Sequence, residues 1–143
     1  MRGVSQREAL VATDSDNVEY QRKLANSYMN AGLLSMRQGQ LDPAEQAMRR
    51  GQSIRAAFQD KPDSRLMRRD FAKGHYNLGL LAVQRNEVDA AQKSFEDAAS
   101  ILEILVGQQP LDLEQKQLLA TCLRLVGDSM AGGVDPSLSI AYY

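Results

Sequence analysis

Residues able to perform nucleophilic or metal chemistry are scarce in this chain. His75 is the only histidine and Cys122 the only cysteine of the 143 residues. One cysteine cannot build a cysteine-based zinc site, and no second histidine is present to complete a ligand set with His75. Cys122 lies in the apolar segment Leu118–Leu123, where a buried thiol is inert. We therefore expect no metal and no cofactor.

Carboxylate pairs are the other candidates for acid–base chemistry. Asp14 with Asp16, and Asp60 with Asp63, fall in expected turns, where aspartate is better explained as a helix cap than as a catalyst. Gly132-Gly133 lacks the lysine and the spacing of a phosphate-binding loop. These patterns predict that the chain is not an enzyme.

A stripe of amide and basic side chains is the more informative pattern, because residues at steps of three and four share one helix face. This first-helix stripe comprises Arg22, Asn26, Met29, Asn30, Leu33 and Arg37, then Arg69, Lys73, Tyr76, Asn77, Leu80 and Gln84, then Thr121, Arg124 and Asp128. Asparagine can pair with both the N–H and the C=O of a peptide. Five cations against Asp128 alone favour an acidic segment or a C-terminal carboxylate as ligand.

The alternative interpretation of the stripe is a solvated helix face, since Arg and Lys are ordinary on exposed helices. The asparagine pair is also compatible with inherited repeat sequence. The candidate peptide-binding residues of the stripe are Asn30, Asn77, Lys73, Tyr76, Arg37, Arg69, Arg22 and Arg124.

Helices must position this stripe. Apolar residues recur at three- and four-residue steps, and alternating strand-like runs are missing, so the pattern predicts an all-α fold. Asp42 and Asp89 look like N-caps, with Pro43 at the first helical position. The expected first helices are Val18–Gln38, Ser64–Arg85 and Leu113–Met130; the second helices are Pro43–Gln59, Ala90–Val106 and Pro136 onward; Val4–Ala12 is the tail of a preceding helix.

The chain also repeats itself. A shift of 47 residues places Arg22 on Arg69, Asn30 on Asn77 and Gly32 on Gly79. Each unit is then an antiparallel helical hairpin, in which Gly32 and Gly79 allow the helices a close crossing. We predict a single repeat domain over 1–143, an α-solenoid with a period of about 47 residues that continues into a longer array. Its parts are repeat 1 at 17–61, repeat 2 at 63–109 and an incomplete repeat 3 at 111–143, after a helix tail at 4–12.

The hairpins resemble the tetratricopeptide repeat. The matching patterns are Tyr28-x-x-Ala31-Gly32-x-x-Ser35 with Ala44, Met48 and Gly51, and His75-x-x-Leu78-Gly79-x-x-Ala82 with Ala91, Phe95 and Ala98. The resemblance implies that His75 packs against its own second helix. It also implies a superhelix whose first helices line a concave groove, where Asn30 and Asn77 grip a ligand backbone. The long period is similar to that of repeat regions attached to bacterial serine/threonine kinases, although this chain carries no kinase motif.

The amino-acid composition disfavours some classes of binding partner. The 17 Lys+Arg and 18 Asp+Glu residues give a net charge of −1, and aromatic residues make up 6% without tryptophan. Both values disfavour nucleic-acid binding. One cysteine fits a reducing compartment, and no apolar run approaches the roughly 18 residues of a membrane span. We expect a cytoplasmic protein without nucleic-acid or membrane partners.

Three functions are compatible with these features. The preferred one is a non-catalytic protein–protein interaction scaffold that binds a peptide, acidic in character, in the concave groove. The second is a structural or self-association segment, because hairpins at array ends leave apolar faces and the run Ile101–Val106 is wide for a one-sided helix. The third is a regulatory repeat region of a multidomain bacterial serine/threonine kinase.

Overall fold

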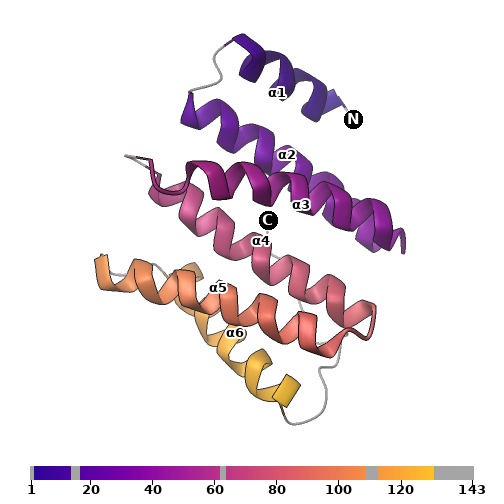
Figure 1. Cartoon of the computed structure of the whole chain (residues 1–143), viewed down its shortest axis with the longest axis vertical. Helices are drawn as coiled ribbons and strands as arrows, with labels where there is room; N and C mark the ends of the chain where they lie inside the picture. Colours follow the sequence, from indigo (N-terminus) through magenta and orange to yellow (C-terminus); the bar gives the residue numbers. More distant parts are fainter. Residues whose placement is uncertain (1, 14–16, 62–63, 109–112, 131–143) are drawn as a thin grey trace. The chain divides into compact units, whose positions relative to one another are not determined.

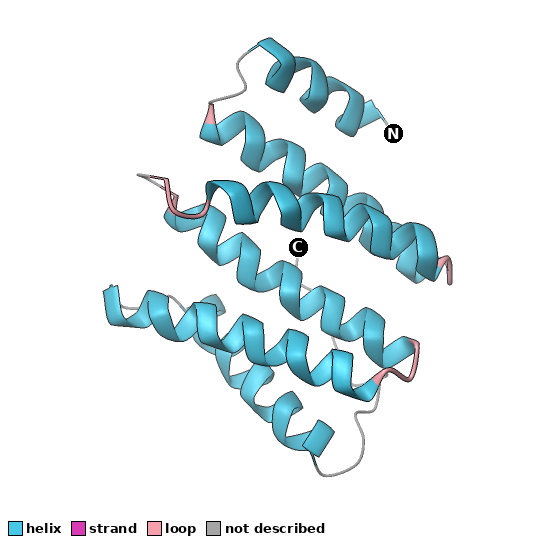
Figure 2. Cartoon of the chain, viewed as in Figure 1, coloured by secondary structure: helices cyan, strands magenta, loops and turns pink. Residues whose placement is uncertain are grey.

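All regular structure in the described part of the chain is helical. The computed structural model describes residues 2–13, 17–61, 64–108 and 113–130 (Figure 1, Figure 2). Its helices are α1 (Arg2–Thr13), α2 (Val18–Arg37), α3 (Leu41–Phe58), α4 (Arg65–Gln84), α5 (Val88–Gln108) and α6 (Leu113–Met130). The all-α prediction is confirmed. The helix expected from Pro136 onward lies outside the described residues.

Turns of one kind end α2 and α4. Gly39 follows α2 with φ 75°, and Asn86 follows α4 with φ 59°. After α2, the N–H of Gly39 donates to Met36 O at 3.0 Å and that of Gln40 to Ser35 O at 2.9 Å. Asn86 and Glu87 repeat the pattern after α4, at 3.0 and 2.9 Å. Both ends are Schellman motifs, which need a residue that tolerates a left-handed backbone.

These turns correct the predicted caps of the second helices. α3 begins at Leu41 and α5 at Val88, two residues before the expected starts. The Schellman turn returns the chain directly into a helix, so Gln40 occupies the N-cap position without a side-chain cap bond. Asp42 is therefore not a cap; it lies in the first turn, where its charge favours the positive end of the helix dipole.

The described residues fall into two compact units, and each has its own core. The first unit runs to Asp70, near the start of α4. Methionine fills much of its interior: Met29, Met36, Met48 and Met67 are at most 7% exposed. Gly32 and Gly51 let α2 and α3 approach closely. A Cβ on Gly32 would lie 2.6 Å from Met48 Cγ, and one on Gly51 would lie 2.9 Å from Ala25 O.

The second unit begins at Phe71 and buries larger, stiffer side chains. Tyr76 packs on Phe95 with ring centroids 5.8 Å apart, and Leu102 and Leu118 join the same cluster. Gly79 faces the Phe95 ring so closely that an added Cβ would lie 2.7 Å from Phe95 Cδ1. The expected close crossing at Gly79 is therefore present.

Candidate functional site

Three arginine side chains from three helices gather near Asp70 in the first unit. We call Arg22, Arg55 and Arg69 the arginine cluster. Arg22 Nε donates to Asp70 Oδ2 at 2.8 Å, and Arg69 Nη2 donates to Asp70 Oδ1 at 3.2 Å. The Asp70 side chain is only 6% exposed. Glu19 lies 3.8 Å from Arg22 and is 53% exposed at its side chain. Asp70 is thus a shared counter-ion for two guanidinium groups.

Arg55 is the most deeply buried member of the cluster, at 4% exposure. Its Nη1 donates to Gln52 Oε1 at 3.0 Å and its Nη2 to Asn26 Oδ1 at 2.9 Å. Both acceptors are neutral amides, and Nε has no hydrogen-bond partner among the described residues. Arg55 is therefore a buried cation whose side-chain hydrogen bonds go to neutral amides.

Burial is the main cause that lowers the pKa of the Arg55 guanidinium to about 10. Arg22 and Arg69 lower this pKa further, whereas the Asp70 carboxylate raises it. A group with that pKa stays protonated at neutral pH. Arg55 consequently adds a positive charge to the cluster under physiological conditions.

The amino end of α4 adds to this positive field. Its first turn contains no acidic residue and includes Arg65 and Arg68. Arg68 Nη1 donates to the carbonyl oxygen of Gln59 at 3.4 Å. The free N–H groups of a helix start carry partial positive charge, so basic residues here raise an already positive potential.

The predicted stripe in the first unit has an exposed part and a buried part. Asn30 and Arg37 are exposed on α2, whereas Met29 and Leu33 belong to the core. Arg22 lies in the arginine cluster, with its side chain 20% exposed. Asn30 and Arg37 are thus the exposed candidate residues of the stripe in this unit, whereas Arg22 offers a ligand only part of its side chain.

The same stripe is largely buried in the second unit. Tyr76 is 1% and Asn77 0% exposed. Lys73 is buried and forms an ion pair with Glu114 at the start of α6. Arg124 is half exposed and pairs with Asp128 at 3.0 Å, one turn along α6. A direct ligand contact at Tyr76 or Asn77 would require these side chains to leave the core, and their binding role stays a prediction.

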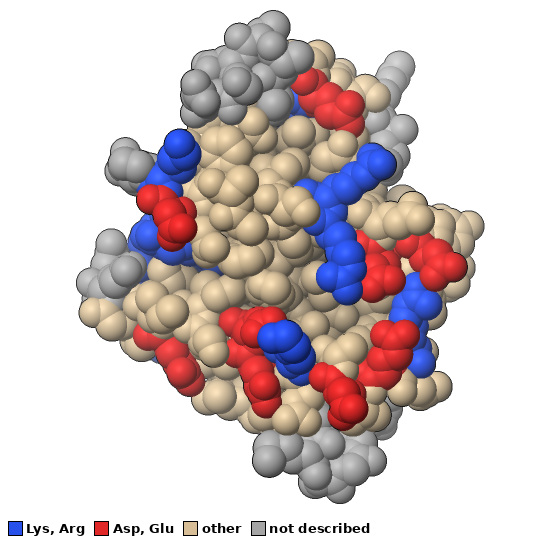
Figure 3. Space-filling model, viewed as in Figure 1, with Lys and Arg blue, Asp and Glu red and all other residues tan. Residues whose placement is uncertain are grey.

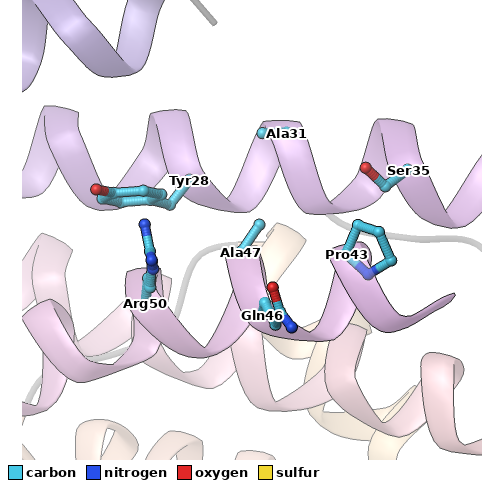
Figure 4. Close-up of a pocket in the computed structure, with 7 residues that line it drawn as sticks. All are labelled: Tyr28, Ala31, Ser35, Pro43, Gln46, Ala47 and Arg50. Carbon is cyan, nitrogen blue, oxygen red and sulfur yellow. The ribbon is translucent and has the colours of Figure 1, made fainter. Parts of the chain in front are cut away.

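A shallow pocket of about 240 Å³ lies between α2 and α3 (Figure 4). Its lining residues are Tyr28, Ala31, Ser35, Pro43, Gln46, Ala47 and Arg50. Figure 4 shows Arg50 pointing from α3 toward Tyr28 on α2, and its guanidinium carbon lies 5.8 Å from the ring centroid. Tyr28 Oη donates to Glu8 Oε1 of α1 at 2.7 Å. This bond, together with burial, raises the pKa of Tyr28.

His75 and Cys122, the residues considered for metal or nucleophilic chemistry, both pack against other side chains. His75 contacts Phe71, one turn earlier on α4, with ring centroids 4.6 Å apart and ring planes tilted by 59°. Cys122 is 0% exposed, and burial raises the pKa of its thiol to about 12. The predicted burial of Cys122 is therefore confirmed. No group of three potential metal ligands occurs among the described residues.

Two members of the arginine site were missed by sequence reasoning. Arg55 is on a second helix, outside the stripe that periodicity highlighted. Asp70 directly follows Arg69, and an isolated acid after three arginines at positions 65, 68 and 69 was a usable signal for a counter-ion.

The charged surface has no single-sign patch on the face drawn in Figure 3, where Lys and Arg lie among Asp and Glu. No helix in the described part of the chain is long and apolar enough to span a bilayer.

The family comparison locates two repeats on these helices. The tetratricopeptide repeat model matches residues 25–58, which cover most of α2 and all of α3, and residues 72–101, which cover parts of α4 and α5. Comparisons with curated proteins and with solved structures gave no match. Repeats of this kind generally mediate protein–protein interactions and are typically non-catalytic. The segments 25–58 and 72–101 of this chain are therefore repeats of the tetratricopeptide family.

Proposed function

We propose that the chain is a non-catalytic scaffold that binds a peptide segment of a partner protein along the first-helix stripe, with the concave groove of a superhelical array as the binding surface. The observation that carries the proposal is the exposed polar edge of α2. Asn30 offers an amide to a peptide backbone, and Arg37 offers a charge to an acidic side chain. The tetratricopeptide matches support the same role.

A repeat period of about 47 residues is part of this proposal. It is supported by the equivalent Schellman turns at Gly39 and Asn86, whose residue numbers differ by 47. Helices longer than those of the usual tetratricopeptide repeat account for the extra length of this period. We expect such an array to be located in the cytoplasm.

A peptide array tests the function directly. The full chain is incubated with overlapping peptides of graded acidity, and hits are measured by calorimetry at low and high salt. Asn30→Ala should weaken binding about fivefold or more at both salt concentrations, through loss of a hydrogen bond. Arg37→Ala should act mainly at low salt, because screening reduces charge attraction. Arg49→Ala, on α3 and paired with Glu45, is the matched control. Capture of no peptide, or equal affinity of all variants, would remove the proposal.

Self-association is the second candidate, and exposed apolar side chains favour it. Ile104 and Val106 on α5 are 62% and 49% exposed, and Leu123 on α6 is 50% exposed. Equilibrium sedimentation over a wide concentration range distinguishes the two functions. A monomer at several hundred micromolar, with peptide binding intact, would leave the scaffold role alone.

A further inference from the structure

The arginine cluster carries more positive charge than its surroundings neutralise. Asp70 is shared by Arg22 and Arg69, and Arg55 donates hydrogen bonds to the amides of Gln52 and Asn26 while it feels the same Asp70 charge. Glu19 is too exposed to balance the cluster well, because water screens its charge. Buried charges are normally paired, since an isolated one loses hydration without compensation. The described residues therefore leave excess positive charge beside Asp70, which a bound anion could neutralise.

The cluster is open on one side. Arg22 and Arg69 keep about a fifth of their side chains in solvent, at 20% and 19% exposure, while Arg55 lies behind them at 4%. A ligand would meet Arg22 and Arg69 directly. Arg55 would act as a positioning residue, because it holds Asn26 on α2 and adds charge from below.

The net positive charge of the arginine cluster indicates which kind of anion it would bind. Three guanidinium groups and the buried Asp70 carboxylate leave two positive charges, which the solvent-exposed Glu19 beside Arg22 offsets only in part. A carboxylate would neutralise one of them with two oxygens, whereas a phosphate monoester carries about −1.5 to −2 charges and three acceptor oxygens at neutral pH. Donors that arrive from different helices suit three tetrahedral oxygens better than one planar carboxylate.

We propose that the arginine cluster binds a phosphate monoester, presented as a phosphorylated side chain of the peptide partner. This inference rests on the peptide-binding function proposed above. It adds a modification-dependent contact at the start of α4 that the stripe residues Asn30 and Arg37 do not supply. The interaction would let phosphorylation of the partner raise its affinity for the chain.

Titration with O-phosphoserine tests the site without a known partner. The arginine Nε–Hε signals of the full chain are followed by NMR at pH 7.5, with acetate at equal ionic strength as the comparison. Signals of Arg22 and Arg69 should shift and saturate with O-phosphoserine only. At pH 5.5, below the second ionisation near pH 6, its affinity should fall several-fold, whereas sulfate should bind equally at both pH values. Equal responses to acetate and O-phosphoserine would overturn the proposal.

Variants separate a ligand site from a structural ion network. Arg69→Gln should weaken O-phosphoserine binding about tenfold or more, through loss of a charge-assisted contact. Arg49→Gln, whose side chain is 65% exposed and paired with Glu45 rather than with the cluster, should leave it unchanged. Asp70→Asn removes the competing carboxylate and should bind O-phosphoserine more tightly. If Asp70→Asn unfolds, inorganic phosphate should restore its helical circular dichroism signal; no restoration would contradict the site.

Peptides tested with and without a phosphate group distinguish the phosphate site from the peptide-binding function on which it rests. Each array peptide is offered in phosphorylated and unphosphorylated form. Phosphorylation should raise affinity in the wild-type chain and lose that advantage in Arg69→Gln. Binding of acidic peptides without any response to O-phosphoserine would remove the phosphate site and leave the scaffold role. Binding of O-phosphoserine with capture of no peptide would remove the scaffold role and identify a site for a free phosphate ester.

Discussion

Helices α2 and α4 carry matching residue types in different surroundings. Asn30 and Asn77 align in the sequence repeat, yet Asn30 is exposed and Asn77 is 0% exposed. Ala31 and Ser35 are partly exposed beside the α2–α3 pocket, whereas their counterparts Leu78 and Ala82 are buried. The comparison teaches that repeat position determines which helix face a residue occupies. Tertiary packing then decides whether that face meets solvent, and so whether an asparagine can bind a ligand or must support the fold.

The largest expected effect concerns the glycine crossings. Gly79→Leu should lower the free energy of unfolding by about 2–4 kcal/mol, because the new side chain must displace the Phe95 ring. Gly127→Leu is the control: an added Cβ there meets no described atom within 4 Å. Denaturant midpoints and slopes of both variants provide the measurement. A Gly79→Leu midpoint equal to that of the wild type would mean that the crossing is assigned wrongly.

The asparagine pair gives the next effect. Asn77→Ala should destabilise the chain by about 1–3 kcal/mol, since it leaves hydrogen-bonding groups in a fully buried site without their partner. Asn30→Ala should change stability by less than about 0.5 kcal/mol, as expected for an exposed position. Thermal unfolding compares the two. Equal losses would erase the distinction between α2 and α4.

Tyr28, which aligns with His75 in the repeat, should make the stability of the folded chain depend on pH in the alkaline range. The bond to Glu8 and burial raise the pKa of Tyr28 above 10.0 in the folded state. Its contribution is therefore fully present below pH 10 and is lost as the pH rises through the folded-state pKa. Tyr28→Phe should cost about 1–2 kcal/mol at pH 8, and less at pH 11.

Arg55 has the opposite linkage, because its pKa is lowered to about 10 and its deprotonation favours the folded state. Subtracting the Tyr28→Phe curve from the wild-type curve cancels this common term. Urea unfolding of both proteins between pH 8 and pH 11 provides the data. Parallel curves across that range would contradict the assigned bond to Glu8.

The smallest effect is expected on α6. Arg124→Ala removes an exposed pair with Asp128 and should cost about 0.3–0.5 kcal/mol. Lys73→Met should affect stability more, because Lys73 is buried against Glu114. Salt should diminish the Arg124→Ala effect more than the Lys73→Met effect, since both partners of the first pair are exposed whereas Lys73 is buried. Unfolding at low and high salt makes the comparison, and a salt-independent Arg124→Ala effect would argue against an exposed pair.

The helices and the close crossings were predictable because they depend on local pattern. Periodic apolar residues located α2 and α4 to within a residue of their ends, and the glycine at position 79 indicated where α5 approaches. The starts of α3 and α5 were misplaced by two residues, because the left-handed turns at Gly39 and Asn86 consume so few residues. Aspartate in a first turn and aspartate at a cap look alike in sequence.

The candidate site was predictable only in part. Steps of three and four found Arg22 and Arg69, but periodicity alone does not say that Asp70 reaches back across 48 residues to Arg22. Arg55 carries no local sign of burial, because an arginine on an amphipathic helix is ordinarily solvated. The environment of Tyr76 and Asn77 likewise depends on neighbours distant in sequence.

The methionine-rich interior of the first unit allows its opening to be followed by methionine oxidation. Met29, Met48 and Met67 are at most 2% exposed, so a peroxide oxidant reaches their sulfur atoms when the helices separate. Sulfoxide formation would then report how often this interior opens, without any added label. Each oxidation would also place a polar S=O group where a flexible thioether had filled the core, so a single opening event could leave a lasting record in the protein.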